Sequence, residues 1–595
     1  MFWLVNMGIM DTQSIKSPTF LIMLILIVLA IDIFALFGKN FRLKNLRYRW
    51  ILFLNILFPV EAYLAFTDQQ DESYIWASKV SNFLTNGHLG VLLYDDKFGE
   101  SSVSSTIFLL ASAVKKFSNL TIEQSLYVPN ILAAVLITIV WQRYAEQKGM
   151  SRLYFIIPLI FLLLDYGFIL CLSASFDVGI SILFCLIILI IFLKKGSFST
   201  YSFAILIGFA EWIRSELLIF KLLYIVLVII YFRREIIGKL RLFTILILTI
   251  IPTLTLLVYK YWAFGGVTPA MIQYKKPQLD AMIYLRGIFY LLQSIGVAGL
   301  VTLLLSIVII YRSFWRGKRI LKIKILQNPL LSFENNWVYI GIAILYCAPI
   351  YAGADYYGAV FQRYILTPLF LTLIIACAKV NDSKKSLENL EAPTRKKYFT
   401  YPEPSFFIIV TIMVVAMNSF FSGVLLNPGI SVKQRPARAT CDQLLGPEIR
   451  SFWSTFSSSP LVIATSEANG IAFSSSAKLL DLSGIVDSRN YPAKYEPVLP
   501  GNLYGKYKFD FLIQQERPSI IWPPYSEHCS FFNPIVDKAI TPKLQLNKNY
   551  SSIFSRYWFP TESKLKELGY CPKEIRVQNR VLGSASATFY YNCVD

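Results

Sequence analysis

Long apolar runs dominate this sequence, and they constrain its fold more than any other feature. Runs of roughly 17–25 apolar residues match the length of a helix that crosses a lipid bilayer. The chain has 595 residues, of which 55% are hydrophobic and only 16% charged, and its mean hydropathy is +0.52. A soluble protein carries about 25% charged residues. The sequence therefore predicts a polytopic α-helical membrane protein.

Basic residues gather at the ends of these apolar runs. The formal net charge is +20, and clusters such as those at 39–49, 194–195 and 312–324 lie between successive runs. Such clusters mark the cytoplasmic side of a membrane protein, so their placement indicates a bilayer as partner and argues against nucleic-acid binding. About twelve spans place every basic cluster in the cytoplasm. The predicted spans are residues 18–37, 50–66, 124–142, 152–170, 174–193, 199–217, 219–232, 242–262, 286–311, 335–353, 362–380 and 405–424.

Two apolar segments need a separate interpretation. The first run lacks a preceding basic region and a small-x-small cleavage site, so we expect an uncleaved helix and not a signal peptide. The segment 103–117 (VSSTIFLLASAVKKF) is short and contains two lysines near its end. We expect it to lie as a helix on the outer membrane surface.

The composition changes after residue 424, which divides the chain into a transmembrane domain, 1–424, and a tail domain, 425–595. In the tail, LVIATSEANGIAFSS and AKLLDLSGIVD each predict a strand followed by a turn or helix, and FDFLIQQERPSIIWPP predicts another strand. Short strands that alternate with helices are typical of a small α/β domain. The predicted topology makes the chain a bacterial inner-membrane protein and places this domain outside the cytoplasm.

The cysteines of the tail agree with an oxidising compartment. An even number of cysteines in such a domain favours two disulfides, and four cysteines allow three connectivities. A zinc site is the alternative, but the spacings are too wide for it and only His528 is nearby. The candidates are Cys441, Cys529, Cys571 and Cys593.

The first predicted outside loop, 67–123, is unusually acidic. We interpret Asp95 and Asp96, which lie beside a lysine, as residues of a solvated loop. Asp71 and Glu72 precede SYIWASKVSNFL, whose apolar residues are spaced as in an amphipathic helix. Two acids at a helix start can serve the helix dipole, or one of them can be a general base at a membrane-surface pocket.

The motifs of this loop resemble those of the polytopic glycosyltransferases of the C superfamily. Within it, they are similar to the branch of the mycobacterial arabinofuranosyltransferase that adds terminal β-(1→2) residues. That branch has two acids followed by (A/S)-(Y/F)-I, then G-H-G, then E-G-(Y/F)-(S/T)-N. The corresponding residues here are Asp71-Glu72-Ser73-Tyr74-Ile75, Gly87-His88-Leu89 and Glu100-Ser101-Ser102, so the third glycine and the end of the last motif depart from the pattern.

Further matches follow in the same order along the chain. SFDVG supplies Asp177, IRSEL supplies Arg214 and Glu216, GGVTPAMIQYKK keeps Lys275 but lacks the N-T pair, and FQRYILTP supplies Arg363. DLSGIVD in the tail matches a motif that follows a strand after the branch's membrane part.

The resemblance implies transfer of a sugar from a polyprenyl-phosphate donor to a glycan, lipid or protein acceptor at the outer membrane face. Such a reaction needs a carboxylate base and cations for the phosphate leaving group. It implies Asp71 as base with Glu72 in support, and phosphate contacts from Arg214, Arg363 and Lys275. Further pocket candidates are Tyr74, His88, Glu100 and Asp177. We expect no cofactor and no resident metal. A divalent metal is the alternative that the residues do not favour.

Several alternatives remain open at this point. Arg214 could neutralise a buried acid, for which Glu211 is expected to be better placed than Glu216, because residues two apart on a helix do not face each other. Arg363 could likewise pair with Asp355, and His88 could be structural. A transporter would have as many spans, but no internal repeat is evident. An O-antigen ligase or polymerase would also use a lipid-linked substrate.

Overall fold

The structure is a computed structural model of the chain. It describes residues 18–37, 55–60, 71–88, 90–99, 104–150, 152–164, 166–173, 177–194, 200–232, 238–264, 336–351, 365–388, 434–465, 470–482, 509–523, 529–532, 562–579 and 583–593.

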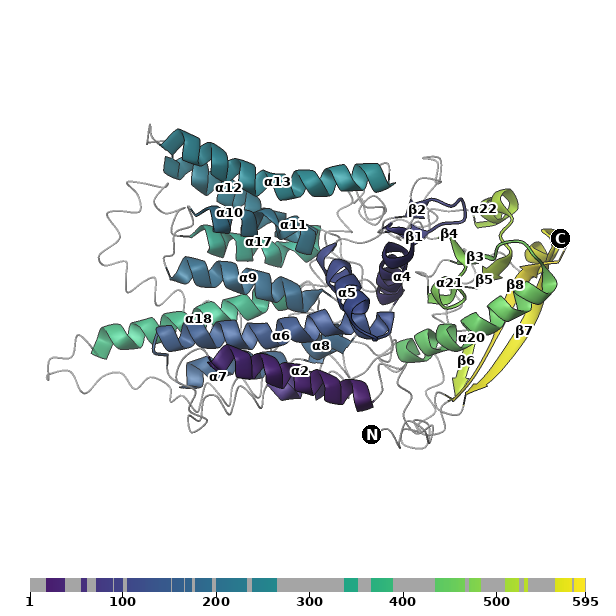
Figure 1. Ribbon diagram of the computed structural model, residues 1–595, viewed down its shortest axis with the longest axis horizontal. Helices are drawn as coiled ribbons and strands as arrows, with labels where there is room; N and C mark the ends of the chain where they lie inside the picture. Colours follow the sequence, from purple (N-terminus) through teal and green to yellow (C-terminus); the bar gives the residue numbers. More distant parts are fainter. Residues whose placement is uncertain are drawn as a thin grey trace.

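The larger part of the molecule is a bundle of apolar helices that run side by side (Figure 1). Within the described ranges, three helices are long and apolar enough to cross a membrane, and several shorter apolar helices accompany them. Together with the composition, they make the chain a polytopic helical membrane protein. The bundle helices are α2 (Pro18–Phe37), α6 (Ile122–Gln147), α7 (Arg152–Leu164), α8 (Tyr166–Ser173), α9 (Val178–Leu193), α10 (Tyr201–Gly208), α11 (Ala210–Ile213), η1 (Ser215–Leu217), α12 (Leu218–Phe232), α13 (Gly238–Phe264), α17 (Trp337–Tyr351) and α18 (Leu366–Glu388).

These helices occupy the runs in which spans were predicted, with two differences. The run 152–170 forms two helices, α7 and α8, and the run 199–217 is divided into α10, α11 and η1. The predicted spans 286–311 and 405–424 lie outside the described residues, so the total number of spans stays a prediction.

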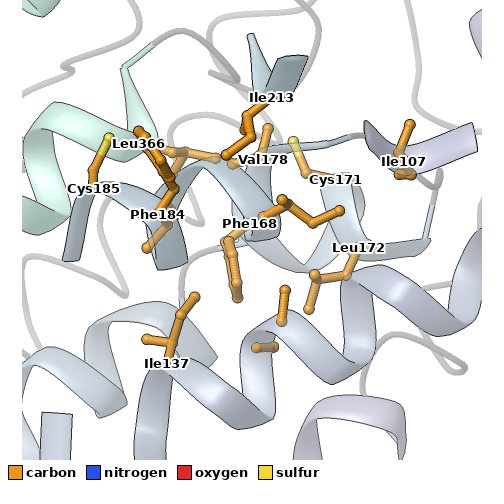
Figure 2. Packing of buried hydrophobic residues seen from close by; sticks show 14 of the residues in the cluster. Ile107, Ile137, Phe168, Cys171, Leu172, Val178, Phe184, Cys185, Ile213 and Leu366 are labelled. Carbon is orange, nitrogen blue, oxygen red and sulfur yellow. The ribbon is translucent and has the colours of Figure 1, made fainter. Parts of the chain in front are cut away.

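Helix α6 lies at the centre of the bundle and α13 at its edge. The apolar window of α6 is 83% buried and that of α13 only 22%. A capping box begins α6: the Thr121 hydroxyl accepts from the Gln124 backbone N–H at 3.2 Å, and the Gln124 side chain accepts from the Thr121 N–H at 3.0 Å. Side chains of α5, α6, α8, α9, α11 and α18 meet in the core around Phe168 (Figure 2).

Two short helices and a hairpin lie between the bundle and the tail domain (Figure 1). They are α4 (Asp71–Asn86), the hairpin of β1 (Val91–Leu92) and β2 (Phe98–Gly99), and α5 (Thr106–Phe117). Helix α5 corresponds to the surface helix expected at 103–117; it packs on α4 and α6 and leaves Phe117 84% exposed. The end of the bundle that α4 and α5 cover is called the tail-facing end below.

The tail domain is built on a six-stranded mixed sheet with the order β4-β3-β5-β8-β6, and β7 pairs with β8. β3 is parallel to both β4 and β5, and β8 is antiparallel to β5, β6 and β7. The strands are β3 (Val462–Thr465), β4 (Lys478–Asp481), β5 (Ile520–Trp522), β6 (Cys529–Phe532), β7 (Tyr570–Asn579) and β8 (Gly583–Asn592); the helices are α20 (Gln434–Phe456), α21 (Gly470–Ser474), α22 (Phe509–Glu516) and α25 (Glu562–Glu567).

The sequence predictions for the tail are right in part. The strand-then-helix unit at β3 and α21 and the strand at β4 lie where they were expected. The strand predicted over FDFLIQQERPSIIWPP is wrong in its first half, because that half forms α22 and β5 begins only at Ile520. Gln and Glu favour a helix over a strand, which explains the error. Of the four candidate cysteines, Cys571 and Cys593 form a disulfide; Cys441 lies on α20 and Cys529 begins β6, and their side chains are outside the description.

Candidate functional site at the tail-facing end

Helix α4 begins at the acidic pair that the sequence singled out. Asp71 and Glu72 form its first turn, although the structure describes only the backbone of residues 71–74. The predicted amphipathic pattern is present: Ile75, Ala77 and Val80 are buried, while Leu84 is 37% exposed. The acidic pair therefore starts a helix that is held on the tail-facing end by its apolar side.

A buried lysine on α4 escaped the sequence interpretation. Lys79 is only 1% exposed, and its Nζ lies 5.8 Å from the centre of the Phe108 ring on α5. Lysine is rarely buried to this extent without partners. The sequence signal was its place on the apolar side of the predicted helix, in the middle of ASKVS.

Arg214 lies where the helical run 199–217 is interrupted. α11 ends at Ile213, and Arg214 has extended backbone angles, φ −157° and ψ 142°, before η1 begins. Its side chain is 5% exposed. The Nη1 atom is 3.1 Å from Oδ1 of Asp177, and the Nε atom is 2.6 Å from Oε1 of Glu216. The guanidinium thus lies between two carboxylates.

The expected partner of Arg214 was wrong. Glu211 was expected to face Arg214 on a continuous helix, with Glu216 turned away. Because the helix stops at Arg214, the chain turns and brings Glu216 to the guanidinium instead. Glu211 pairs with Lys221, whose Nζ is 3.5 Å from Oε1 of Glu211 and also contacts the Thr253 hydroxyl.

Asp177 comes to this cluster from the start of α9. It is the N-cap residue of α9, but its side chain makes no capping hydrogen bond with the helix. The carboxylate is directed to Arg214 and is 9% exposed. Asp177 and Arg214 are therefore two predicted site residues that the structure brings together across 37 positions of the sequence. The Arg214 cluster comprises Asp177, Glu211, Arg214, Glu216 and Lys221.

Helix α5 connects the Arg214 cluster with α4. The carbonyl of Trp212 accepts from the Ser105 backbone N–H at 2.9 Å and from the Thr106 hydroxyl at 2.8 Å. The Trp212 indole N–H donates to the Pro252 carbonyl on α13 at 2.7 Å. Since α5 also packs along α4, the acidic helix and the Arg214 cluster share one supporting element.

His88 lies apart from the Arg214 cluster, in a stack of aromatic rings. Its ring centre is 4.5 Å from that of Phe98 on β2 and 6.2 Å from that of Trp262 on α13, with nearly parallel planes. This stacking favours the structural interpretation of His88 over a catalytic one.

The remaining candidates are not placed. Glu100, Lys275 and Arg363 lie outside the described residues, as does Asp355, and the side chain of Tyr74 is not described. Within the described ranges, no group of three or more His, Cys, Asp or Glu side chains could hold a metal ion.

Comparisons with known proteins find likenesses in structure but none in sequence. No protein-family model matches the sequence, and no curated protein sequence matches it. The chain is similar in structure to ArnT from Cupriavidus metallidurans in the apo state, at 12% identity and a TM-score of 0.46, over 84% of this chain and 95% of that chain. A likeness of this degree carries no argument about function, which has to come from the residues of this chain.

Proposed function

We propose that this chain is a membrane glycosyltransferase that moves a sugar from a polyprenyl-phosphate donor to a glycan, lipid or protein acceptor of the cell envelope. The observation that carries the proposal is the tail-facing end itself. A helix that starts with two acids is packed there, and α5 ties it to a buried arginine that two carboxylates hold. Acidic and cationic groups at one end of a membrane-spanning bundle are the groups that this chemistry needs.

The proposed reaction assigns a separate role to each group. The acceptor hydroxyl attacks the anomeric carbon of the sugar, and the bond from that carbon to the phosphate oxygen breaks. The phosphate leaves with the bonding electrons, while the Asp71 carboxylate takes the hydroxyl proton. Glu72 supports or replaces Asp71 in this role.

Of the three residues proposed to contact the donor phosphate, Arg214 is the one that the structure describes. A guanidinium has five N–H donors and binds phosphate oxygens in pairs. The carboxylates of Asp177 and Glu216 lie within ion-pair distance of it, so donor binding would have to share or displace them. Lys275 and Arg363 remain proposed contacts.

The proposed orientation places the tail on the side of a bacterial inner membrane that faces away from the cytoplasm. The Cys571–Cys593 disulfide supports it, because disulfides persist in oxidising compartments. The two other tail cysteines lie on α20 and β6, elements that pack together, which supports Cys441–Cys529 as the second pair.

The acidic pair is tested by Asp71→Asn in the full chain. Membranes that contain each variant would receive the lipid extract of a strain lacking the protein, and loss of the lipid-linked sugar would be followed by mass spectrometry. Since a positioned base contributes about 10²–10⁴-fold, we expect turnover to fall at least about 100-fold with an unchanged melting temperature.

Asp95→Asn is the matched control, because Asp95 is an aspartate of the same loop whose ion pair with Lys97 stays within the hairpin. It should transfer normally. Near-normal turnover by Asp71→Asn would contradict the assignment of the base. Wild-type membranes that leave every lipid-linked sugar intact would contradict the proposed function.

A further inference from the structure

We infer that the tail domain positions helix α4, by holding the hairpin that continues α4 at the edge of its own sheet. The hairpin here means residues 90–99. This inference rests on the proposed function of the acidic pair, because what the tail would position is the start of α4.

The backbone of the hairpin joins the sheet of the tail. Leu93 forms a parallel bridge with Leu479 of β4, and the Tyr94 N–H donates to the Leu479 carbonyl at 3.0 Å. β4 is the end strand of the six-stranded sheet. An end strand offers unpaired backbone groups, and here a segment 386 positions earlier in the chain (479 − 93) takes them up.

Side chains of the hairpin reinforce this contact. The Tyr94 ring packs against the buried cluster of the tail around Ile513 and Leu480, and its hydroxyl shares a hydrogen bond with Glu516. Lys478 Nζ lies 2.6 Å from Oδ1 and 2.7 Å from Oδ2 of Asp96. Asp96 has φ +62°, a left-handed conformation that Asp and Asn tolerate better than most residues.

The other side of the hairpin is fixed to the bundle and to α4. Phe98 lies against His88, which stacks on Trp262 of α13. At Gly90 an added Cβ would lie 2.6 Å from the Phe98 Cβ and 2.9 Å from the Phe264 ring, so only glycine fits. The Asn82 side chain of α4 donates to the Gly90 carbonyl at 2.7 Å.

These contacts leave the hairpin little freedom relative to α4. α4 has 16 residues, which corresponds to a rod of about 24 Å. Any tilt that the hairpin transmits would move the acidic start of this rod, and a misplacement of about 1 Å can cost about 100-fold in rate. α21 of the tail also packs on α4 directly. Tyr94, Asp96 and Lys478 are thus positioning residues and not catalytic ones.

The ion pair gives a graded test in the full chain. Asp96→Asn and Lys478→Gln should each lower kcat about two- to fivefold, the size expected for an exposed ion pair, with KM for the donor unchanged. The double variant should lose no more than either single variant, because both remove the same contact. Lys97→Gln is the matched control, since Lys97 pairs with Asp95 inside the hairpin. Additive losses, or an equal loss for the control, would overturn the inference.

Tyr94→Ala gives the larger test, with a readout that does not depend on transfer. It removes the ring from the buried cluster of the tail, and we expect faster amide hydrogen exchange throughout α4 and at least a tenfold lower kcat. Unchanged exchange in α4 would overturn the positioning role, whatever the enzyme transfers. If wild type transfers no sugar but α4 loses protection in Tyr94→Ala, the docking stands and the proposed function fails.

A cross-link tests whether the docked state is the working state. Asp96→Cys with Lys478→Cys, joined by a short reducible bis-methanethiosulfonate, should form a link in membranes and keep the turnover of wild type. Without the cross-linker, the same two-cysteine variant should have the lower turnover of the double variant above. A linked enzyme that is inactive until reduced would overturn the inference, because the tail would then have to leave the hairpin.

Discussion

Arg214 and Asp32 are both buried ionisable residues of the helical bundle, but their surroundings differ. Arg214 lies between two carboxylates at a break in a helix. Asp32 lies inside α2 and is 0% exposed. It accepts a hydrogen bond from the Asn55 amide at 2.7 Å, and Asn55 in turn accepts from the Thr138 hydroxyl at 2.5 Å.

The two groups also lie at different depths. Asp177 of the Arg214 cluster lies two residues before Gly179, where an added Cβ would contact Asn130 of α6. The Arg214 cluster is therefore level with Asn130. Thr138 lies eight residues further along α6 than Asn130, or about 12 Å, away from the tail-facing end. Within the described ranges, no Lys or Arg lies within ion-pair distance of Asp32. Opposite charges thus gather where helices end near α5, whereas the deeper carboxyl of Asp32 joins three helical segments through neutral partners.

The largest effect is expected at Arg214. Arg214→Ala removes the proposed charge-assisted contact with the donor phosphate. Such a contact is worth about 1.5–3 kcal/mol, so donor affinity or rate should fall roughly ten- to hundredfold. It also leaves Asp177 and Glu216 without their cation, so the melting temperature should fall. Transfer rates, binding of a polyprenyl-phosphate analogue and thermal melting would be measured together.

A double variant separates the two roles of Arg214. Arg214→Ala with Glu216→Gln should regain melting temperature but not transfer, and Arg214→Lys should regain only part of the transfer because the planar fork is lost. Arg576→Ala is the matched control: Arg576 pairs with Glu574, also two residues away, but on the exposed side of β7. Should the double variant transfer normally, Arg214 is a structural residue and the contrast with Asp32 disappears.

A smaller effect is expected at Asp32, and on stability alone. Asp32→Asn keeps an oxygen that accepts from Asn55, so melting and transfer should change little. Asp32→Leu leaves the buried Asn55 amide without its acceptor, which costs about 1–3 kcal/mol. Thermal melting of both variants checks this order. Loss of transfer by a stable Asp32→Asn would show that the deeper cluster takes part in the reaction.

The sequence predicted the elements better than their partners. The length of apolar runs is a local property, so α2, α9 and α13 lie where it placed them. The acidic start of α4 and its buried side followed from helical periodicity. The break at Arg214 did not, because IRSEL contains neither Gly nor Pro. The extended backbone there accompanies a tertiary contact with Asp177 and a local contact with Glu216.

The docking of the hairpin on the tail was equally beyond local patterns. Asp96 looked like one more acid of a solvated loop, and its partner Lys478 is 382 positions away. Strand β7 was also missed, because its apolar residues Ile575 and Val577 alternate with charged ones over only a short stretch. Pairing with β8, and not composition, makes it a strand.

The smallest effect is expected at Glu516 of the tail, an acid that, like Asp32, has a neutral hydrogen-bond partner. Burial raises the pKa of Glu516, the hydrogen bond with Tyr94 lowers it, and the nearby Asp95 raises it. Because the net pKa shift is upward, the folded state binds this proton more tightly than the unfolded state does. Stability should therefore fall as pH rises from the ordinary pKa of a glutamate through the raised folded value. Glu516→Gln keeps an acceptor for Tyr94 and cannot ionise, so it should melt slightly higher than wild type at pH 7 and equally near pH 4. Glu567→Gln, on the exposed end of α25, should show no such gain at pH 7. If Glu516→Gln raises the melting temperature equally at both pH values, ionisation of Glu516 is not the cause of the gain.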